Sequence, residues 1–204
     1  MVVSFWNRTN VFKLLLDPLG KLIYFDVLDY FMDYKYYEAF TNKKPKSKYD
    51  VTLIFQHPKA FSNLIIDLIK PFKNTDFNKV AGLEALGFIL GGAVACKLRK
   101  GFVPVRKKGK LPDIKGAVIR ASFIDYTKNK KTFEMNKSAI KKGDKVLIVD
   151  DLIETGSQAR SAIKLIEKQG GKVIGITVMC AERTPKAEIL FEKYNCKAIK
   201  IFDK

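Results

Sequence analysis

Two neighbouring aspartates, Asp150 and Asp151, follow an apolar run and precede a small-residue turn in the stretch VLIVDDLIETGSQARSA, residues 146–162. Carboxylates repel phosphate, but they accept hydrogen bonds from a vicinal diol, directly or through a divalent cation. The turn 154–158 opens a predicted helix, and its free backbone N–H groups would attract an anion with the help of the helix dipole. The stretch therefore predicts a ligand with hydroxyls or a metal at one end and a phosphate at the other.

Other interpretations of these residues are available. An apolar strand that ends in two aspartates is similar to a Walker B motif, but a P-loop needs a lysine after its second glycine, and Gly87 is followed by Phe88. The segment GLEALG, residues 82–87, lacks the middle glycine of a dinucleotide-binding GxGxxG. Aspartates that only cap a helix, and a glycine that only makes a tight turn, explain the residues about as well as a binding site does.

Strand-like and helix-like segments alternate around this motif. Buried strands are predicted near 77–82, 102–105, 145–149, 172–180 and 197–202, and helices near 60–70, 85–98, 158–168 and 185–194. This order predicts an α/β fold with an open, mainly parallel, twisted sheet flanked by helices. The stretches 82–87 and 150–157 would then lie at the carboxyl edge of the sheet, where ligands of such folds bind.

Two stretches are less regular. Residues 106–137 form a long polar connection rich in Lys and Gly, which is typical of a functional flap or a disordered segment. The first 75 residues include the aromatic stretch LIYFDVLDYFMDYKYYEAF. A length of 204 residues, 47% of them hydrophobic, is enough for one core, so we expect a single domain over 1–204.

The formal charge of +17 attracts nucleic acid, acidic membranes or small polyanions without choosing among them. No apolar run is long enough to span a bilayer, and the N-terminus lacks the pattern of a signal peptide. One histidine, His57, cannot build a zinc site. Three distant cysteines, Cys96, Cys180 and Cys196, indicate reduced, mostly buried thiols, so we expect a cytoplasmic protein.

The pattern apolar-apolar-apolar-Asp-Asp-x-x-x-Thr-Gly resembles the phosphoribosyl pyrophosphate (PRPP) motif of type I phosphoribosyltransferases. GLEALGF (82–88), FVPVRKKGKLP (102–112) and FEMNKSAIKKGDKVLIVDDLIETG (133–156) are similar, in order and spacing, to the adenine-specific members. The similarity covers about residues 60–180. It implies transfer of a phosphoribosyl group from PRPP to adenine, giving AMP and pyrophosphate, with Mg²⁺. It also implies a homodimer, a small N-terminal hood that binds the base (1–50), and a long flexible flap (106–137).

The resemblance implies roles for the PRPP-contacting residues. Asp150 and Asp151 would hold the ribose hydroxyls. The 5′-phosphate would be bound by Glu154, Thr155, Gly156, Ser157 and Gln158. The pyrophosphate would be approached by the turn Glu84, Ala85 and Leu86, often through unusual peptide geometry in this family, and by Arg106, Lys107 and Lys110. No dedicated metal site is implied, because PRPP would carry Mg²⁺, with Asp150 or Asp151 as a contact.

The resemblance also implies contacts to the base. Ile23, Tyr24 and Phe25 would lie on one side of the purine, and Leu152 and Ile153 on the other. In the flap, Tyr126 matches a family tyrosine, and Asp125 stands where many members carry a glutamate proposed to handle a purine proton. Without the resemblance, the aromatic stretch is explained by core packing and Asp125 by a solvated loop carboxylate.

The chain departs from the family at three positions. Leu86 replaces an arginine, Glu154 places a carboxylate in the phosphate loop, and Phe25 replaces an arginine in the base-binding segment. The base could therefore be guanine, hypoxanthine or xanthine instead. A different class of function is a PRPP- or nucleotide-sensing regulator that binds nucleic acid, although no helix-turn-helix pattern precedes the core.

Overall fold

The computed structural model describes residues 3–7, 10–16, 22–26, 52–124 and 129–202. The chain divides into two compact units, Met1–Leu64 and Ile65–Lys204, and each is described by itself. The expectation of one domain over 1–204, with a hood over 1–50, stays a prediction.

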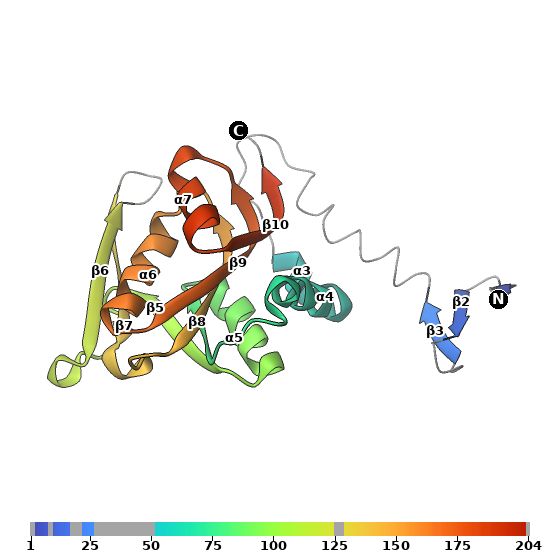
Figure 1. The fold of residues 1–204 in the computed structure, drawn as a ribbon, viewed down its shortest axis with the longest axis horizontal. Helices are drawn as coiled ribbons and strands as arrows, with labels where there is room; N and C mark the ends of the chain where they lie inside the picture. The colour runs from blue at the N-terminus through green and yellow to red at the C-terminus, as the bar shows by residue number, and fades with distance from the viewer. Residues whose placement is uncertain (1–2, 8–9, 17–21, 27–51, 125–128, 203–204) are drawn as a thin grey trace. The chain divides into compact units, whose positions relative to one another are not determined.

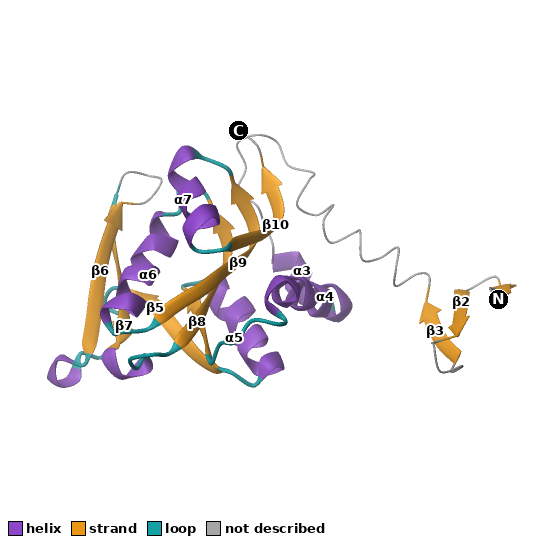
Figure 2. Ribbon diagram, in the orientation of Figure 1, coloured by secondary structure: helices purple, strands orange, loops and turns teal. Residues whose placement is uncertain are grey.

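The first unit contains a three-stranded antiparallel sheet in the order β1 (Val3–Asn7), β2 (Asn10–Leu16), β3 (Leu22–Asp26) (Figure 2). Helix α3 (Thr52–Gln56) and the start of α4 (Pro58–Ile69) follow. Proline at the first helical position of α4 loses no hydrogen bond, because that N–H has no partner inside a helix. Ile23, Tyr24 and Phe25 lie on β3, but their side chains fall outside the described part of the structure.

The second unit is built on a seven-stranded sheet in the order β10-β9-β8-β4-β5-β7-β6 (Figure 1). Its first five strands in this order are parallel, and β7 and β6 join β5 in antiparallel fashion. The strands are β4 (Lys79–Leu83), β5 (Gly101–Lys107), β6 (Val118–Ile124), β7 (Lys130–Asn136), β8 (Lys145–Ile153), β9 (Lys172–Glu182) and β10 (Cys196–Phe202). The predicted α/β class with an open, mainly parallel sheet is confirmed.

Helices cover both faces of this sheet. They are α5 (Leu86–Leu98), α6 (Ser157–Lys168) and α7 (Pro185–Lys193), with 3₁₀ turns η1 (Lys70–Phe72), η2 (Ile114–Gly116) and η3 (Lys137–Ala139). The crossover from β4 through α5 moves to β5, whereas the crossover from β8 through α6 moves the other way to β9. Right-handed crossovers in opposite directions place α5 on one face and α6 and α7 on the other. The strand order therefore reverses between β4 and β8, and such a switch point is where open α/β sheets bind ligands.

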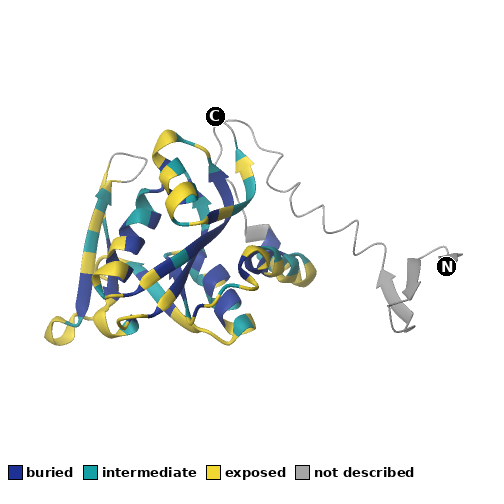
Figure 3. Ribbon diagram, viewed as in Figure 1, coloured by how far each residue is buried: buried dark blue, intermediate teal, exposed yellow. Residues whose placement is uncertain are grey.

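The core follows the central strands (Figure 3). The side chains of Val146–Val149 in β8 are fully buried, as expected for a parallel strand covered on both faces. Along α6, Ala159, Ala162, Ile163 and Ile166 recur at helical spacing and are all buried. On the other face, the Thr177 hydroxyl donates to the Leu68 carbonyl oxygen over 2.9 Å, which ties the end of α4 to β9.

Two local predictions are wrong. The strand predicted near 145–149 is too short, because β8 continues to Ile153, which pairs with Ala181 of β9. Most of the polar connection 106–137 is not irregular either, since β6 and β7 form an antiparallel pair and β7 also pairs with β5. Among the cysteines, Cys180 and Cys196 are buried as expected, but Cys96 is exposed. None of the described helices is long and apolar enough to cross a membrane.

Candidate active site

Helix α5 begins against Asp150 at the switch point. Gly87, in its first turn, has no side chain, and a Cβ there would lie 2.8 Å from Asp150 Oδ1 and 2.9 Å from the Val149 carbonyl oxygen. Gly82, at the end of β4, similarly allows the Gly87 carbonyl to approach. The two glycines of GLEALG therefore let the β4–α5 turn pack closely on the end of β8.

The aspartates at this point differ in exposure. Asp150 is 7% exposed, and Asp151 beside it is half-buried. Burial raises the pKa of Asp150 well above its usual range, and the neighbouring charge of Asp151 raises it further. The positive charge of Lys107 lowers the pKa of Asp150, because this cation of β5 lies close enough to interact with the carboxylate. A ligand that donates to Asp150, or carries a cation to it, would favour its ionised form.

The turn after β8 has the geometry of an anion site. Gly156 precedes α6 in the left-handed conformation, with φ 71°, and a Cβ there would lie 2.6 Å from a Leu190 methyl group. No side chain caps α6 at Gly156. The Thr155 hydroxyl donates to Ser157 Oγ over 3.2 Å, so both hydroxyls lie at the start of the helix. The Ser157 N–H donates to Thr155 Oγ1 over 3.5 Å, and the other first-turn N–H groups and the helix dipole favour an anion at this end.

The β4–α5 turn is fixed to the end of β5. The peptide bond between Glu84 and Ala85 is cis, as the resemblance led us to expect of an unusual geometry here. The Glu84 N–H donates to the Val105 carbonyl, and Glu84 Oε2 accepts the Lys107 N–H over 3.0 Å. Arg106 Nε lies 3.5 Å from the same carboxylate oxygen. Ala85 is exposed and Leu86 is half-buried.

The basic loop after β5 is organised by a buried glutamate of β7. Glu134 is fully buried, and its Oε1 accepts the N–H groups of Lys110 and Leu111, each over 2.7 Å. Its Oε2 accepts from Arg120 Nε over 3.3 Å. Burial alone would raise the pKa of Glu134, but these hydrogen bonds to the carboxylate hold it below its ordinary value of 4.5. Glu134 therefore fixes the backbone that carries Lys110.

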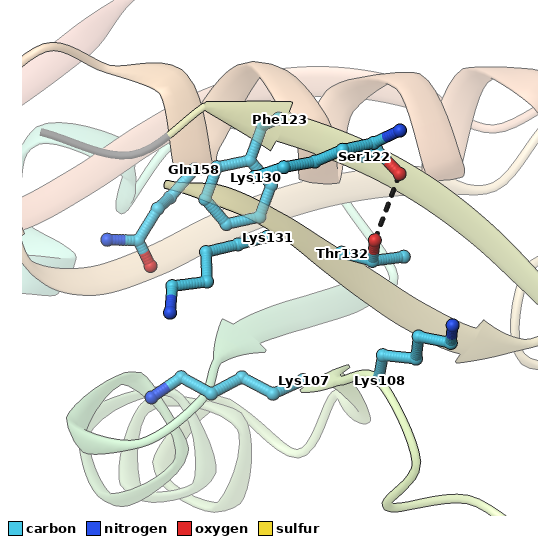
Figure 4. Close-up of a pocket in the computed structure, with 8 residues that line it drawn as sticks. All are labelled: Lys107, Lys108, Ser122, Phe123, Lys130, Lys131, Thr132 and Gln158. Carbon is cyan, nitrogen blue, oxygen red and sulfur yellow. Dashed lines mark hydrogen bonds between the residues drawn. The ribbon is translucent and has the colours of Figure 1, made fainter. Parts of the chain in front are cut away.

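A cavity of about 780 Å³ lies beside this loop, between the hairpin β6–β7, the end of β5 and the start of α6 (Figure 4). Four of its lining residues are lysines. The full lining is Lys107, Lys108, Ser122, Phe123, Lys130, Lys131, Thr132 and Gln158. Ser122 and Thr132 share a hydrogen bond of 2.9 Å across the hairpin. So many cations around one cavity favour a polyanionic ligand.

The structure brings some of the predicted site residues together and separates others. Gln158, at the start of α6, and Lys107, at the end of β5, line the same cavity. Ile153 faces the core at 3% exposure, which leaves half-buried Leu152 as the candidate for contact with a base. Asp125 and Tyr126 lie outside the described residues.

Sequence reasoning missed the hairpin's contribution to the site. Four residues of the predicted polar connection 106–137 belong to the hairpin or to its junction with β5: Lys108, Lys130, Lys131 and Glu134. The signal was present as a period of two: Ala121 and Phe123 alternate with polar residues in one strand, and Phe133 and Met135 do so in the other.

Comparison with protein families gives one family model, the phosphoribosyl transferase domain, which matches residues 50–204. An adenine phosphoribosyltransferase of Cereibacter sphaeroides (strain ATCC 17023) is 51% identical over 127 residues, which make up 62% of this chain and 68% of that protein. One from Jannaschia sp. (strain CCS1) has the same identity and coverage.

Two solved structures are similar to this fold. The adenine phosphoribosyltransferase of Rhodothermus marinus superposes with a TM-score of 0.70 at 35% identity, over 80% of this chain and 91% of that one. The enzyme of Giardia lamblia in complex with 9-deazaadenine gives a TM-score of 0.69 at 29% identity, over 94% of this chain and 93% of that one.

Proposed function

The chain belongs to the phosphoribosyltransferase family, and we propose that it is the purine salvage enzyme that transfers the phosphoribosyl group of PRPP to adenine, giving AMP and pyrophosphate. The choice of adenine rests on relatives of that name at 51% identity and on the related structure that holds 9-deazaadenine. The departures at Leu86 and Glu154 lie in the PRPP-binding segments and do not select another purine. The third departure, Phe25, lies in the predicted base-binding segment, whose side chains fall outside the described part of the structure.

The observation that carries the proposal is the pairing of two chemistries at the switch point. Asp150 of β8 lies against Gly87 of the β4–α5 turn, Asp151 follows it in the strand, and an uncapped helix N-terminus follows at Ser157. The carboxylates match the ribose hydroxyls, and the turn Glu154–Gln158 matches the 5′-phosphate. Glu84, Ala85 and Leu86 would present backbone to the pyrophosphate, with Lys107 and Lys110 as nearby cations.

These residues bind and orient the substrate, and the reaction needs no nucleophilic side chain. As the bond from C1′ to pyrophosphate breaks and the bond to the purine nitrogen forms, positive charge develops on the ribose ring and negative charge on the leaving group. The protein contributes by holding the reacting atoms in line and by placing lysine ammonium groups near the departing oxygens. A proton leaves the purine during the reaction, and Asp125 is the candidate to accept it.

We propose Mg²⁺ as the cofactor, brought by PRPP. The described residues contain no cluster of three His, Cys, Asp or Glu side chains that could hold a metal alone. The pair Asp150 and Asp151 nevertheless fits a magnesium ion that keeps most of its ligands from phosphate and water, since such ions need only one or two carboxylates. When bound, Mg²⁺ neutralises phosphate charge on substrate and product.

We also propose a cytoplasmic homodimer, without nucleic acid as a partner. The three cysteines are all free thiols, which fits a reducing compartment. Ile89 of α5 is 44% exposed and Phe102 of β5 is 37% exposed, and a second copy of the chain would bury large apolar side chains of this kind. Light scattering coupled to size exclusion tests the dimer.

The test of function is turnover of the purified chain with PRPP, Mg²⁺ and one purine at a time. We expect AMP, identified by chromatography, to form together with pyrophosphate when adenine is supplied, and much slower product formation with guanine, hypoxanthine or xanthine. Faster turnover of another purine would correct the substrate. No turnover with any purine, combined with salt-sensitive binding to duplex DNA, would overturn the proposal in favour of the regulator.

A further inference from the structure

The four lysines of the cavity carry charge that the described residues do not neutralise. Lys107, Lys108, Lys130 and Lys131 are all exposed, and none of them forms a salt bridge with any acidic group among the residues described in the second unit. Like charges gathered around one cavity repel one another, and an anion relieves that repulsion. The question is which of the four face the place where the substrate binds.

The register of the strands divides the lysines into two pairs. Lys107 pairs with Phe133 across β5 and β7, and Lys131 is two residues from Phe133, so both side chains leave the same face of the sheet. Lys108 and Lys130 leave the opposite face. Figure 4 agrees, because the ammonium groups of Lys107 and Lys131 extend toward the side of the cavity where Gln158 lies, and those of Lys108 and Lys130 extend the other way.

Other basic groups close to the site are already engaged. Arg106 Nη1 donates to the Lys110 carbonyl over 3.1 Å, its Nε lies 3.5 Å from Glu84, and its guanidinium lies over the Phe88 ring, 6.0 Å from the centroid. Arg120 is bound to Asp113 and Glu134. Leu86, at the start of α5, has no charge to offer. Among the four lysines that line the cavity, the two that extend toward its Gln158 end are Lys107 and Lys131.

We propose that Lys131 is a substrate-binding residue that contacts the pyrophosphate group of PRPP together with Lys107. This inference rests on the proposed function. Lys107 acts electrostatically on Asp150, where the ribose would bind, and the pyrophosphate leaves from the carbon next to the ribose hydroxyls. Lys131 lies on the same face from the neighbouring strand, so the two ammonium groups can hold one diphosphate between them. The hairpin thus carries part of the leaving-group site.

The test compares Lys131→Gln with Lys130→Gln, which removes the same charge from the same strand but from the opposite face. Each protein is titrated calorimetrically with pyrophosphate in the presence of Mg²⁺, and separately with AMP, at fixed ionic strength. We expect Lys131→Gln to weaken pyrophosphate binding about tenfold, the loss of one charge-assisted hydrogen bond. We expect AMP binding by Lys131→Gln, and both affinities of Lys130→Gln, to stay within about twofold. Lys131→Arg should restore most of the pyrophosphate affinity, because it keeps the cation.

Equal losses in Lys131→Gln and Lys130→Gln would overturn the inference, since the effect would then be one of overall charge. Weaker AMP binding with unchanged pyrophosphate binding would also overturn it, because Lys131 would then serve the 5′-phosphate. The proposed function is tested apart from this by AMP formation in the unsubstituted protein. If the unsubstituted protein makes no AMP, the proposed function is wrong. If Lys131→Gln nevertheless weakens pyrophosphate binding and Lys130→Gln does not, the contact between Lys131 and pyrophosphate is still supported.

Discussion

Glu134 is buried under the hairpin, and replacing it with glutamine should destabilise the protein and loosen the basic loop. Its Oε1 accepts two backbone N–H groups at 2.7 Å, and its Oε2 accepts from Arg120. Glutamine is nearly isosteric, but it carries one oxygen and one NH₂ group. Whichever way the amide turns, a donor then faces a donor, either at the loop N–H groups of Lys110 and Leu111 or at Arg120.

The size of the effect follows from the two short hydrogen bonds. A hydrogen bond to a charged group contributes about 1.5–3 kcal/mol, and a neutral one about 0.5–1.5 kcal/mol. Two bonds that lose their charge therefore cost about 2–3 kcal/mol of unfolding free energy in total. We add nothing for Arg120, which is 38% exposed and screened by water. For a chain of this size the loss corresponds to a fall in Tm of about 4–12 °C.

The assay is thermal and urea unfolding of Glu134→Gln beside Glu192→Gln, a matched substitution at an exposed position of α7. Because the folded pKa of Glu134 is lowered, its stabilisation is present above the unfolded value and is lost as pH falls through the folded value. The difference in unfolding free energy between the original chain and Glu134→Gln should therefore shrink below about pH 4.5. A loss no larger than that of Glu192→Gln at pH 7, or a difference that grows on acidification, would refute the reasoning.

Three further predictions concern the switch point. Asp150→Asn should raise Tm at pH 7, because the folded pKa of Asp150 is raised and its ionised carboxylate destabilises the fold at that pH; a lower Tm would contradict the burial argument. The same substitution should raise the KM for PRPP by about tenfold or more, because it removes a charge-assisted hydrogen bond to the ribose. For the same reason, the KM for PRPP of the original chain should fall as pH rises through the pKa of Asp150, measured in steady-state assays; a KM independent of pH would count against ribose binding by its ionised form. Gly87→Ala should cost about 1–3 kcal/mol in urea unfolding, because its Cβ would meet Asp150 and backbone, whereas Gly92→Ala has open space and should be neutral or stabilising; equal effects would contradict the close packing.

The parts of the fold that the sequence predicts are those whose signals are local. The buried run 146–149 and the four-residue helical face of α6 each lie within one element, so their period identifies the element and its buried side. The hairpin also has a local signal, the alternation of apolar and polar residues, but its many lysines make the segment similar in composition to a loop. Irregular connections are also basic and polar, so composition outweighed the alternation around Phe123 and Phe133.

The set of lysines that face the Gln158 end of the cavity depends on the pairing register of β5 with β7, which cannot be read from the sequence. Lys107 and Lys131 are 24 residues apart, and only the pairing of Lys107 with Phe133 places both on one face. A shift of one residue in that pairing would move Lys131 to the opposite side and bring Lys130 to the Gln158 end. The lysines can be counted from the sequence, but the face of the sheet that each side chain leaves is known only from the strand register in the structure.

The same distinction explains why the two strand–turn–helix units, which look alike in sequence, have different tasks. In the β4–α5 unit, Gly82 and Gly87 are required for close packing, because a side chain at either position would collide with the backbone of the turn or with β8. That turn can offer backbone to a ligand, but its glycines do not form a phosphate loop. At the second, Gly156 adopts a left-handed conformation at the start of α6, and no side chain caps the helix there. The 5′-phosphate is therefore expected at α6, whereas the pyrophosphate would meet the backbone of the β4–α5 turn, and the acidic pair between the two would meet the ribose hydroxyls.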